Sequence, residues 1–101
     1  MSPDRPLAIR RTRRAEIDLT EIWLYIAVSN EAAADRVLDE IARVCRLIAT
    51  RPQMGRKRPE LKAGIRSFGV MSWIIFYLVH DDFVEILRVL HSARDLDAME
   101  F

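Results

Sequence analysis

The chain has 101 residues, half of them hydrophobic, and a formal net charge of +1 at pH 7. A chain of this length buries about 60–65% of its unfolded surface, which is enough for one core but not for a large enclosed pocket. The apolar content excludes a disordered chain. No apolar run approaches the roughly 18 residues that a membrane span requires. The sequence therefore predicts a single domain over residues 1–101.

Cysteine usage and the N-terminal residues indicate the compartment. Cys45 is the single cysteine, so no internal disulfide can form, and this favours a reducing environment. Residues 1–14 are charged and lack the apolar stretch of a secretory signal. We therefore expect a cytoplasmic protein. Neither metal-ligand spacing nor a phosphate-binding glycine loop is present, so no metal or cofactor is expected.

Charge is unevenly distributed along the chain. Residues 1–14 carry five arginines and one aspartate, and residues 51–66 carry six basic residues and one glutamate. Residues 15–50 and 67–101 are both acidic on balance. If the two basic segments meet in space, they form a positive surface for an anionic or acidic partner. The alternative is two solvated segments that lie apart.

The first half of the chain predicts a strand and then a helix. Residues 7–10 are short and apolar, as in a strand. Thr12 stands where a helix N-cap belongs, because its hydroxyl can accept a hydrogen bond from a free backbone N–H. Glu16 and Asp18 suit the positive end of a helix. A buried helical face is then predicted for Leu19, Ile22, Trp23, Ile26 and Ala27.

A second helix is predicted after Ser29-Asn30, either residue of which can cap it. Its apolar stripe consists of Ala34, Val37, Leu38, Ile41, Val44, Cys45 and Ile48. On that stripe, Cys45 is expected to be a buried small hydrophobe, not a nucleophile or ligand. Pro52 ends the helix because it disfavours helical backbone at Arg51. The short break predicts an antiparallel helical hairpin.

The second half of the chain predicts a sheet. Residues 53–64 form a basic loop with scattered glycine and proline. Three strands follow: residues 65–70, 72–79 and 83–90. The second is apolar on both faces, as a central strand covered by helices would be, and the tight turn after it requires antiparallel pairing. Residues 93–101 are predicted to form a short helix or a tail.

These elements define an α+β fold class. We predict an N-terminal strand and an antiparallel two-helix hairpin packed on a mainly antiparallel sheet, in the order β-α-α-β-β-β. The apolar stripe of the hairpin needs a cover, and the sheet supplies it.

One group of residues could support chemistry: Arg66, His91 and Arg94, with Arg56, Lys57 and Arg58 as further cations. Metal-free RNA cleavage needs a base, an acid and cations for the phosphorane charge. His91 could be the acid, and Arg66 and Arg94 could hold phosphate bidentately. Glu60 is a candidate base. The favoured alternative is structural: His91 hydrogen-bonds at the strand end and Arg94 pairs with Asp95 or Asp97.

Three aromatic residues could present a surface to a partner: Trp23, Trp73 and Tyr77. Such rings can anchor a docked helix. At these spacings core packing is the more common outcome, and both interpretations stay open.

Several segments, in order from Leu7 to Asp95, are together similar to a known family. They are Thr12…Ala15…Asp18-Leu19…Ile22, Pro52…Gly55-Arg56, Ile65-Arg66-Ser67-Phe68, Trp73-Ile74-Ile75-Phe76-Tyr77 and Ile86-Leu87-Arg88-Val89-Leu90-His91-Ser92-Ala93-Arg94-Asp95. The set resembles the ParE toxins of the RelE/ParE superfamily.

The resemblance implies the toxin half of a bacterial type II toxin–antitoxin pair. It implies a ParD-like antitoxin that binds operator DNA and folds a C-terminal amphipathic helix onto the toxin. Toxins of the ParE branch are associated with inhibition of DNA gyrase, whereas the RelE branch cleaves mRNA in the ribosome. RelE-type nucleases typically carry a C-terminal Tyr or His, but this chain ends in Met99-Glu100-Phe101 and turns acidic after Arg94.

We therefore expect a gyrase inhibitor that is not an enzyme, with no small-molecule substrate and no membrane partner. The residues expected to contact the target or carry toxicity are Arg56, Arg66, His91 and Arg94. Those expected to bind the antitoxin are Trp23, Trp73 and Tyr77. The alternatives are a ribosome-dependent mRNA endoribonuclease of the RelE type and a non-toxic interaction module.

Overall fold

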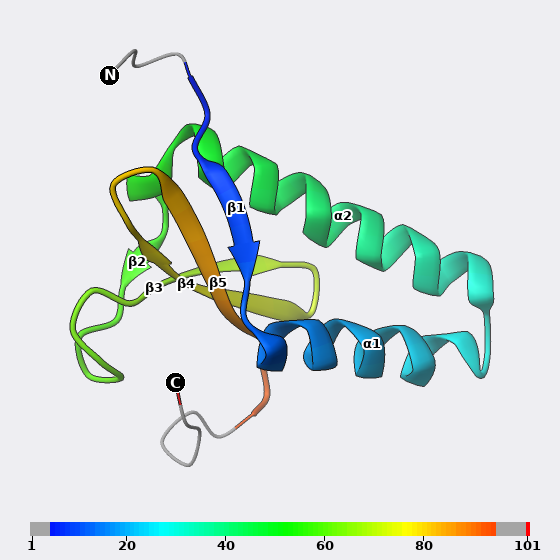
Figure 1. The fold of residues 1–101 in the computed structure, drawn as a ribbon. Helices are drawn as coiled ribbons and strands as arrows, with labels where there is room; N and C mark the ends of the chain where they lie inside the picture. The colour runs from blue at the N-terminus through cyan, green and yellow to red at the C-terminus, as the bar shows by residue number, and fades with distance from the viewer. Residues whose placement is uncertain (1–4, 95–100) are drawn as a thin grey trace.

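The computed structural model describes residues 5–94 and residue 101. Its elements are β1 (Ala8–Arg11), α1 (Arg13–Ala27), α2 (Glu31–Thr50), the short 3-10 helix η1 (Pro52–Met54), β2 (Arg56–Lys57), β3 (Arg66–Val70), β4 (Trp73–Val79) and β5 (Phe83–His91). In Figure 1 the two helices meet at the α1–α2 turn and diverge toward the sheet. The predicted α+β class and the order strand, two helices, then strands are confirmed.

The helix boundaries follow from local hydrogen bonding. The Thr12 hydroxyl accepts from the Ala15 N–H at 3.0 Å, and the Asn30 side chain accepts from the Ala33 N–H at 3.0 Å. Each bond satisfies one of the backbone donors left free in a first helical turn. Asn30, not Ser29, is therefore the second cap. The helix α2 stops before Pro52, as predicted.

The sheet has five strands in the order β1-β5-β4-β3-β2. The strand β1 runs parallel to β5, and the other neighbours are antiparallel. The predicted loop over residues 53–64 is partly wrong, because it contains η1 and the two-residue strand β2. Two paired residues are too few to produce an alternating hydrophobic pattern, so β2 leaves no signal in the sequence.

The central strand β4 has apolar residues on both faces, but helices cover only one of them. Ile75 and Tyr77 of β4 belong to the cluster that α1 and α2 cover. Phe76 belongs to a second cluster on the other face, where Leu61 and Phe101 pack against it. The Phe101 and Phe76 rings lie edge to face with centroids 5.0 Å apart. Helices therefore cover one face, as the predicted hairpin on a sheet requires, and a loop and the last residue pack on the other.

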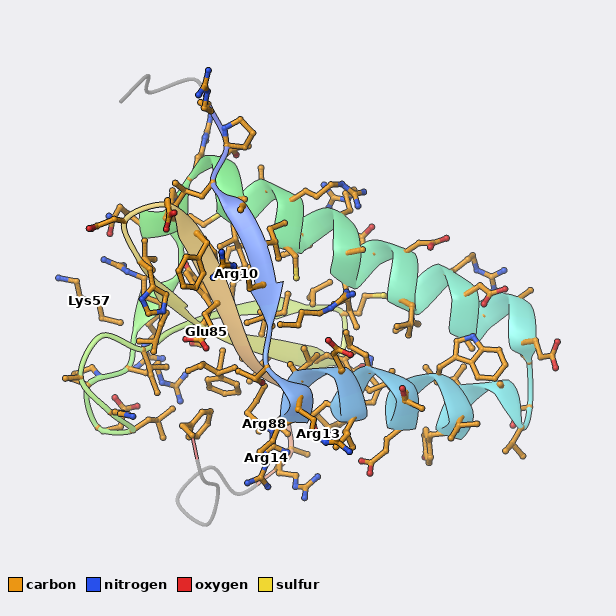
Figure 2. All side chains as sticks on the ribbon, viewed as in Figure 1. Arg10, Arg13, Arg14, Lys57, Glu85 and Arg88 are labelled. Atoms are coloured by element: carbon orange, nitrogen blue, oxygen red, sulfur yellow. The ribbon has the colours of Figure 1, made fainter. Side chains whose placement is uncertain are left out.

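The topology separates the two basic segments. The first lies around β1 and the second around β2, and these strands are the two edges of the sheet. Figure 2 shows Lys57 and Arg13 on separate sides of the molecule. The two basic segments therefore do not meet, and they do not form the single positive surface that was one of the two predicted alternatives.

Tyr77 fastens the segment before β2 to the centre of the sheet. Its side chain is 0% exposed, and its hydroxyl accepts from the Gly55 N–H at 2.8 Å and donates to the Pro52 carbonyl at 2.9 Å. Burial raises the pKa of the Tyr77 phenol, and the Gly55 N–H partly opposes that shift. The prediction that Tyr77 binds an antitoxin is wrong, because a fully buried ring offers no surface.

Replacing Gly55 by alanine should lower the free energy of unfolding by about 1–3 kcal/mol. A Cβ atom at Gly55 would lie 2.3 Å from the Tyr77 hydroxyl oxygen, whereas one at Gly69 would lie 4.0 Å from the Trp73 carbonyl oxygen. Urea unfolding of Gly55→Ala, with Gly69→Ala as the matched control, measures the difference. Equal stability of the two variants would contradict the close approach.

Candidate functional site

The site begins where β1 ends and α1 continues along the edge of β5. Beyond the last paired residue of β1, the Thr12 N–H donates to the Ile86 carbonyl at 3.0 Å, and its hydroxyl donates to the Leu87 carbonyl at 2.8 Å. The same hydroxyl caps α1. Thr12 therefore joins the helix start to the free edge of the strand.

Asp18 lies nearly two turns after Thr12 on α1 and binds the next part of the same β5 edge. Its carboxylate accepts two hydrogen bonds from the Arg88 guanidinium, at 2.8 and 2.9 Å, and a third from the Val89 N–H at 3.0 Å. The side chains of Asp18 and Arg88 are each only 7% exposed. The hydrogen bond that Arg88 donates to Asp18 raises the pKa of Arg88. This bidentate pair, on α1 and β5, fixes the helix against the strand.

A bulge in β5 places Arg88 at this position. Ile86 pairs with Tyr77 and Arg88 with Phe76, so Leu87 is an extra residue between two successive pairs. Ile86 and Val89 consequently both face the helix-covered cluster, while Leu87 faces the other cluster. Strict alternation would instead have put Ile86 and Arg88 on one face. Figure 2 shows Arg88 beside the first turn of α1, near Arg13 and Arg14.

An open groove of about 660 Å³ adjoins the Asp18–Arg88 pair, between α1, the β3–β4 turn and the end of β5. We call it the α1–β4 groove. Its lining is Asp18, Glu21, Ile22, Tyr25, Ile26, Val37, Met71, Ser72, Trp73, Val89, Leu90, His91 and Arg94. Tyr25 and Met71 are 78% and 67% exposed. The groove thus combines an apolar floor and rim with two carboxylates, an imidazole and a guanidinium.

His91 stands at the end of β5 and lines the groove. Its ring lies edge-on to Trp73, with centroids 5.1 Å apart, and its Nδ1 accepts from the Ala93 N–H at 3.1 Å. A neutral ring in this arrangement carries its proton on Nε2. The predicted hydrogen bond of His91 at the strand end is therefore present. The predicted pairing of Arg94 involves Asp95 or Asp97, which lie outside the described residues.

The structure does not bring Arg66 to His91 and Arg94. Arg66 pairs with Tyr77 across the sheet, whereas His91 pairs with Trp73, four residues away along β4. That offset is roughly 13 Å at the rise of a strand. The Arg66 guanidinium instead donates to the Gly55 carbonyl at 2.9 Å and to the Gln53 carbonyl and side chain at 3.1 and 2.6 Å. The prediction that Arg66, His91 and Arg94 together form one phosphate site is therefore wrong.

The remaining cations of the second basic segment are also dispersed. Arg58 donates to Glu60 at 2.8 Å and to the Ser67 hydroxyl at 3.2 Å. The pKa of Glu60 is lowered by a hydrogen bond from its own backbone and then by Arg58, which disfavours Glu60 as a base near neutral pH. Arg56 is exposed on β2, at the edge of the sheet opposite β1.

The aromatic candidates do not share one surface. Trp73 lines the α1–β4 groove. Trp23 is half-buried in a separate hollow beside Leu24 and Leu38, and its indole N–H donates to the Asp35 carboxylate at 2.8 Å. Trp23 therefore joins α1 to α2, and of the three aromatic residues only Trp73 faces the groove.

Within the described residues, no group of three or more His, Cys, Asp or Glu side chains could hold a metal ion. Burial raises the pKa of the Cys45 thiol to about 11, so the thiolate is scarce at neutral pH, as expected for a packed hydrophobe. The part of the chain described here contains no helix long and apolar enough to cross a membrane.

The fold is that of a small α+β protein: an N-terminal strand, a helical hairpin and a mainly antiparallel sheet, with a mixed-charge groove at the end of the last strand. The model of a known family, the ParE toxin of the type II toxin–antitoxin system parDE, matches residues 9–96. The Toxin ParE1 of Caulobacter vibrioides is 38% identical over 91 residues, covering 88% of this chain and 93% of that protein. The chain belongs to the ParE toxin family.

Two solved structures share the fold. The chromosomal ParDE toxin–antitoxin system from P. aeruginosa matches with a TM-score of 0.71 and 20% identity, covering 89% of this chain and 98% of that one. The toxin–antitoxin complex RelBE2 from Mycobacterium tuberculosis matches with a TM-score of 0.67 and 23% identity, covering 86% and 99%. The same fold therefore occurs in two toxin–antitoxin systems, one described as ParDE and the other as RelBE2.

Sequence reasoning missed the Asp18–Arg88 pair. From the sequence alone, Asp18 suits the positive end of a helix, and Arg88 is one residue of a predicted strand. One signal was present: Asp18 lies four residues before the buried Ile22 and three after the buried Ala15, on the apolar face of α1. A carboxylate on such a face requires a charged partner, and Arg88 lies in an otherwise apolar run.

Replacing Asp18 by asparagine should lower the free energy of unfolding by about 3–5 kcal/mol, because it leaves the Arg88 charge buried without its counterion. Chemical denaturation measures this loss. The matched control is Glu40→Gln, which breaks the exposed Glu40–Arg43 pair and should change stability little. Similar stabilities of the two variants would show that the buried pair contributes no more than a surface pair.

Proposed function

We propose that this protein is a type II toxin that inhibits DNA gyrase by binding it, without catalysing a reaction of its own. Membership of the ParE family is the observation that carries the proposal. The separation of Arg66 from His91 and Arg94 supports it, since acid–base cleavage of RNA needs these groups around one phosphate. The carboxylate of Glu21, which is exposed and lines the α1–β4 groove, would also repel a phosphate there.

We further propose that a ParD-like antitoxin neutralises the toxin by direct binding. Two structures that share the fold are described as ParDE and RelBE2 toxin–antitoxin systems. The apolar part of the α1–β4 groove supports docking of an amphipathic segment, with Tyr25, Met71 and Trp73 as its exposed or half-exposed apolar contacts. Operator DNA would be held through the antitoxin.

A second candidate function is ribosome-dependent cleavage of mRNA by the RelE route. Its specific support is His91, which lines the groove and, as an imidazolium, could donate a proton from Nε2 to a leaving oxygen. Arg94 lines the same groove and could hold phosphate. A third candidate, a non-toxic interaction module, predicts that expression without antitoxin leaves growth unaffected.

Substituting both His91 and Arg94 by alanine should reduce inhibition of gyrase by about tenfold or more, if the exposed end of β5 contacts the enzyme. The measurement is plasmid supercoiling by purified gyrase during toxin titration, with linear plasmid scored alongside. Wild-type toxin should inhibit supercoiling and accumulate linear DNA. The control Arg36→Gln removes an exposed charge from α2 and should behave as wild type.

The outcomes separate the candidates. Loss of inhibition by the double variant, with a normal thermal midpoint, would support the proposed contact. Full inhibition would remove His91 and Arg94 from it. If folded wild-type protein leaves gyrase unaffected but produces cleaved ends in ribosome-bound mRNA, the RelE route replaces the gyrase proposal.

Substituting Tyr25 by serine should weaken antitoxin binding by about tenfold or more, because an exposed tyrosine at the rim of an apolar groove is a typical anchor. The side chain is largely exposed, so the fold should be retained. Val28→Ser is the matched control, since Val28 is also exposed on the hairpin but does not line the groove. Isothermal calorimetry with the antitoxin measures both, and equal affinities would place the docking surface elsewhere.

A further inference from the structure

The strand β1 leaves one of its two backbone edges open. Among the described strands it is the outermost, and it pairs with β5 alone (Figure 1). The Ala8 and Thr12 N–H groups donate to backbone carbonyls on the β5 side, at 3.3 and 3.0 Å. Because the backbone groups of successive strand residues point to opposite edges, the N–H and C=O groups of Ile9 and Arg11 point away from β5.

The open part of this edge extends from Ile9 to Arg11. Before it, the Leu7 N–H donates to the Ala49 carbonyl at the end of α2, at 2.9 Å, and after it α1 begins at Arg13. Within the described residues, the outward backbone groups of Ile9 and Arg11 form no hydrogen bond. Every residue of β1 is exposed. The edge therefore offers two donors and two acceptors in one row.

The side chains of β1 place positive charge on both faces of the sheet. Arg10 lies on the face away from the helices, with its guanidinium 4.3 Å from the centroid of the Phe83 ring. Arg11 lies on the helix-covered face, where it lines a hollow with Glu16 and Leu24. The side chains of an added strand alternate between the same two faces. A strand is therefore a form of ligand that meets both arginines at once.

The surroundings of the open edge favour an acidic ligand. Residues 5–14 contain five arginines and no acidic residue. Opposite charges that face each other across two paired strands are stabilising, and like charges are destabilising. An incoming strand with carboxylates is thus preferred to a neutral or a basic one.

We propose that the outer edge of β1 binds an extended acidic segment of a partner protein as an added antiparallel strand. Such a strand exchanges up to four backbone hydrogen bonds with Ile9 and Arg11, because directly opposite residues of an antiparallel pair can share two. Carboxylates at two neighbouring positions of the segment then face Arg10 and Arg11 on the two sides of the sheet. The main-chain bonds supply affinity, and the acidic positions supply the preference.

Two other occupants fit this edge less well. Phosphate oxygens of a nucleic acid accept hydrogen bonds but donate none, so the carbonyls of Ile9 and Arg11 would stay unpaired beside negative charge. A second copy of this chain can use all the free groups only if Ile9 faces the Arg11 of the other copy. The two Arg10 side chains then face each other, and like charges in that position are destabilising.

This inference goes beyond gyrase inhibition and antitoxin docking in the α1–β4 groove, and it depends on neither. No residue of β1 lines that groove. The open edge is therefore a second interaction surface, at which recognition is mainly by backbone groups.

The test is hydrogen exchange by nuclear magnetic resonance, with the purified chain and the synthetic peptide acetyl-Thr-Val-Glu-Glu-Val-Thr-amide. Its two adjacent glutamates supply one carboxylate to each face. The amide hydrogens of Ile9 and Arg11 should exchange rapidly in the free chain and about tenfold more slowly with saturating peptide. The Arg10 amide, which points toward β5, should change little and serves as the internal control.

Variants separate strand pairing from simple charge attraction. Ile9→Pro removes one outward N–H and is compatible with an edge strand, so it should weaken peptide binding by about tenfold or more. Ile9→Val keeps that N–H and is the matched control. If Ile9→Pro does not fold, the peptide N-methylated at its first glutamate and second valine replaces it. That peptide keeps its charge but loses the two amides that would donate to β1, and it should not bind.

Substituting Arg10 and Arg11 by glutamine should weaken binding of the acidic peptide by about tenfold, but not binding of the same peptide with glutamine in place of glutamate. Arg36→Gln/Arg46→Gln removes equal charge from exposed positions of α2 and should bind as wild type.

Four results would overturn the proposal. One is unchanged exchange of the Ile9 and Arg11 amides when peptide is bound, and another is equal binding of the N-methylated peptide, since either would indicate charge attraction alone. A third is absence of binding by folded wild-type chain at about 5 mM peptide. The fourth is protection of the same two amides without peptide in a chain that sediments as a dimer, which would assign the edge to a second copy.

Discussion

The ion pair between Asp18 and Arg88 is the interaction on which the arrangement of helix and sheet depends. The strand β1 covers only the first part of the β5 edge, and past it β5 would be left with unpaired backbone groups. Thr12 and Asp18 of α1 supply the missing partners for Leu87 and Val89. Because the carboxylate is buried, it requires a counterion, and Arg88 provides one in bidentate geometry. A helix thereby closes the edge of a sheet, where an exposed strand would invite further pairing.

This closure also shapes the functional surface. With α1 held at the end of β5, its Glu21 and Tyr25 stand across from the β3–β4 turn and from Trp73. The α1–β4 groove is the space that remains between them. The α1 wall of the groove therefore includes Asp18, whose ion pair with Arg88 also stabilises the fold. A groove built in this way is preformed, which reduces the conformational entropy lost when a partner docks.

Charge is distributed on the molecule by topology, not by sequence distance. The parallel pairing of β1 with β5 carries the first basic segment to one edge, and the pairing of β2 with β3 carries the second to the other. Two cations of the second segment are engaged: Arg66 holds the backbone around Gln53, and Arg58 pairs with Glu60. Arg11 and Arg13 of the first segment form no such bonds with described residues.

The sequence by itself determined the elements whose signals are local. Thr12 and Asn30 form caps with neighbouring N–H groups, Pro52 prevents continuation of α2, and the apolar run of β4 requires burial on both faces. The tertiary structure decided what depends on residues far apart in the chain. The bulge at Leu87, the Tyr77 bonds to the segment before β2 and the separation of Arg66 from His91 all follow from strand register. A register is set by the pairing of whole strands, and no short sequence window contains that information.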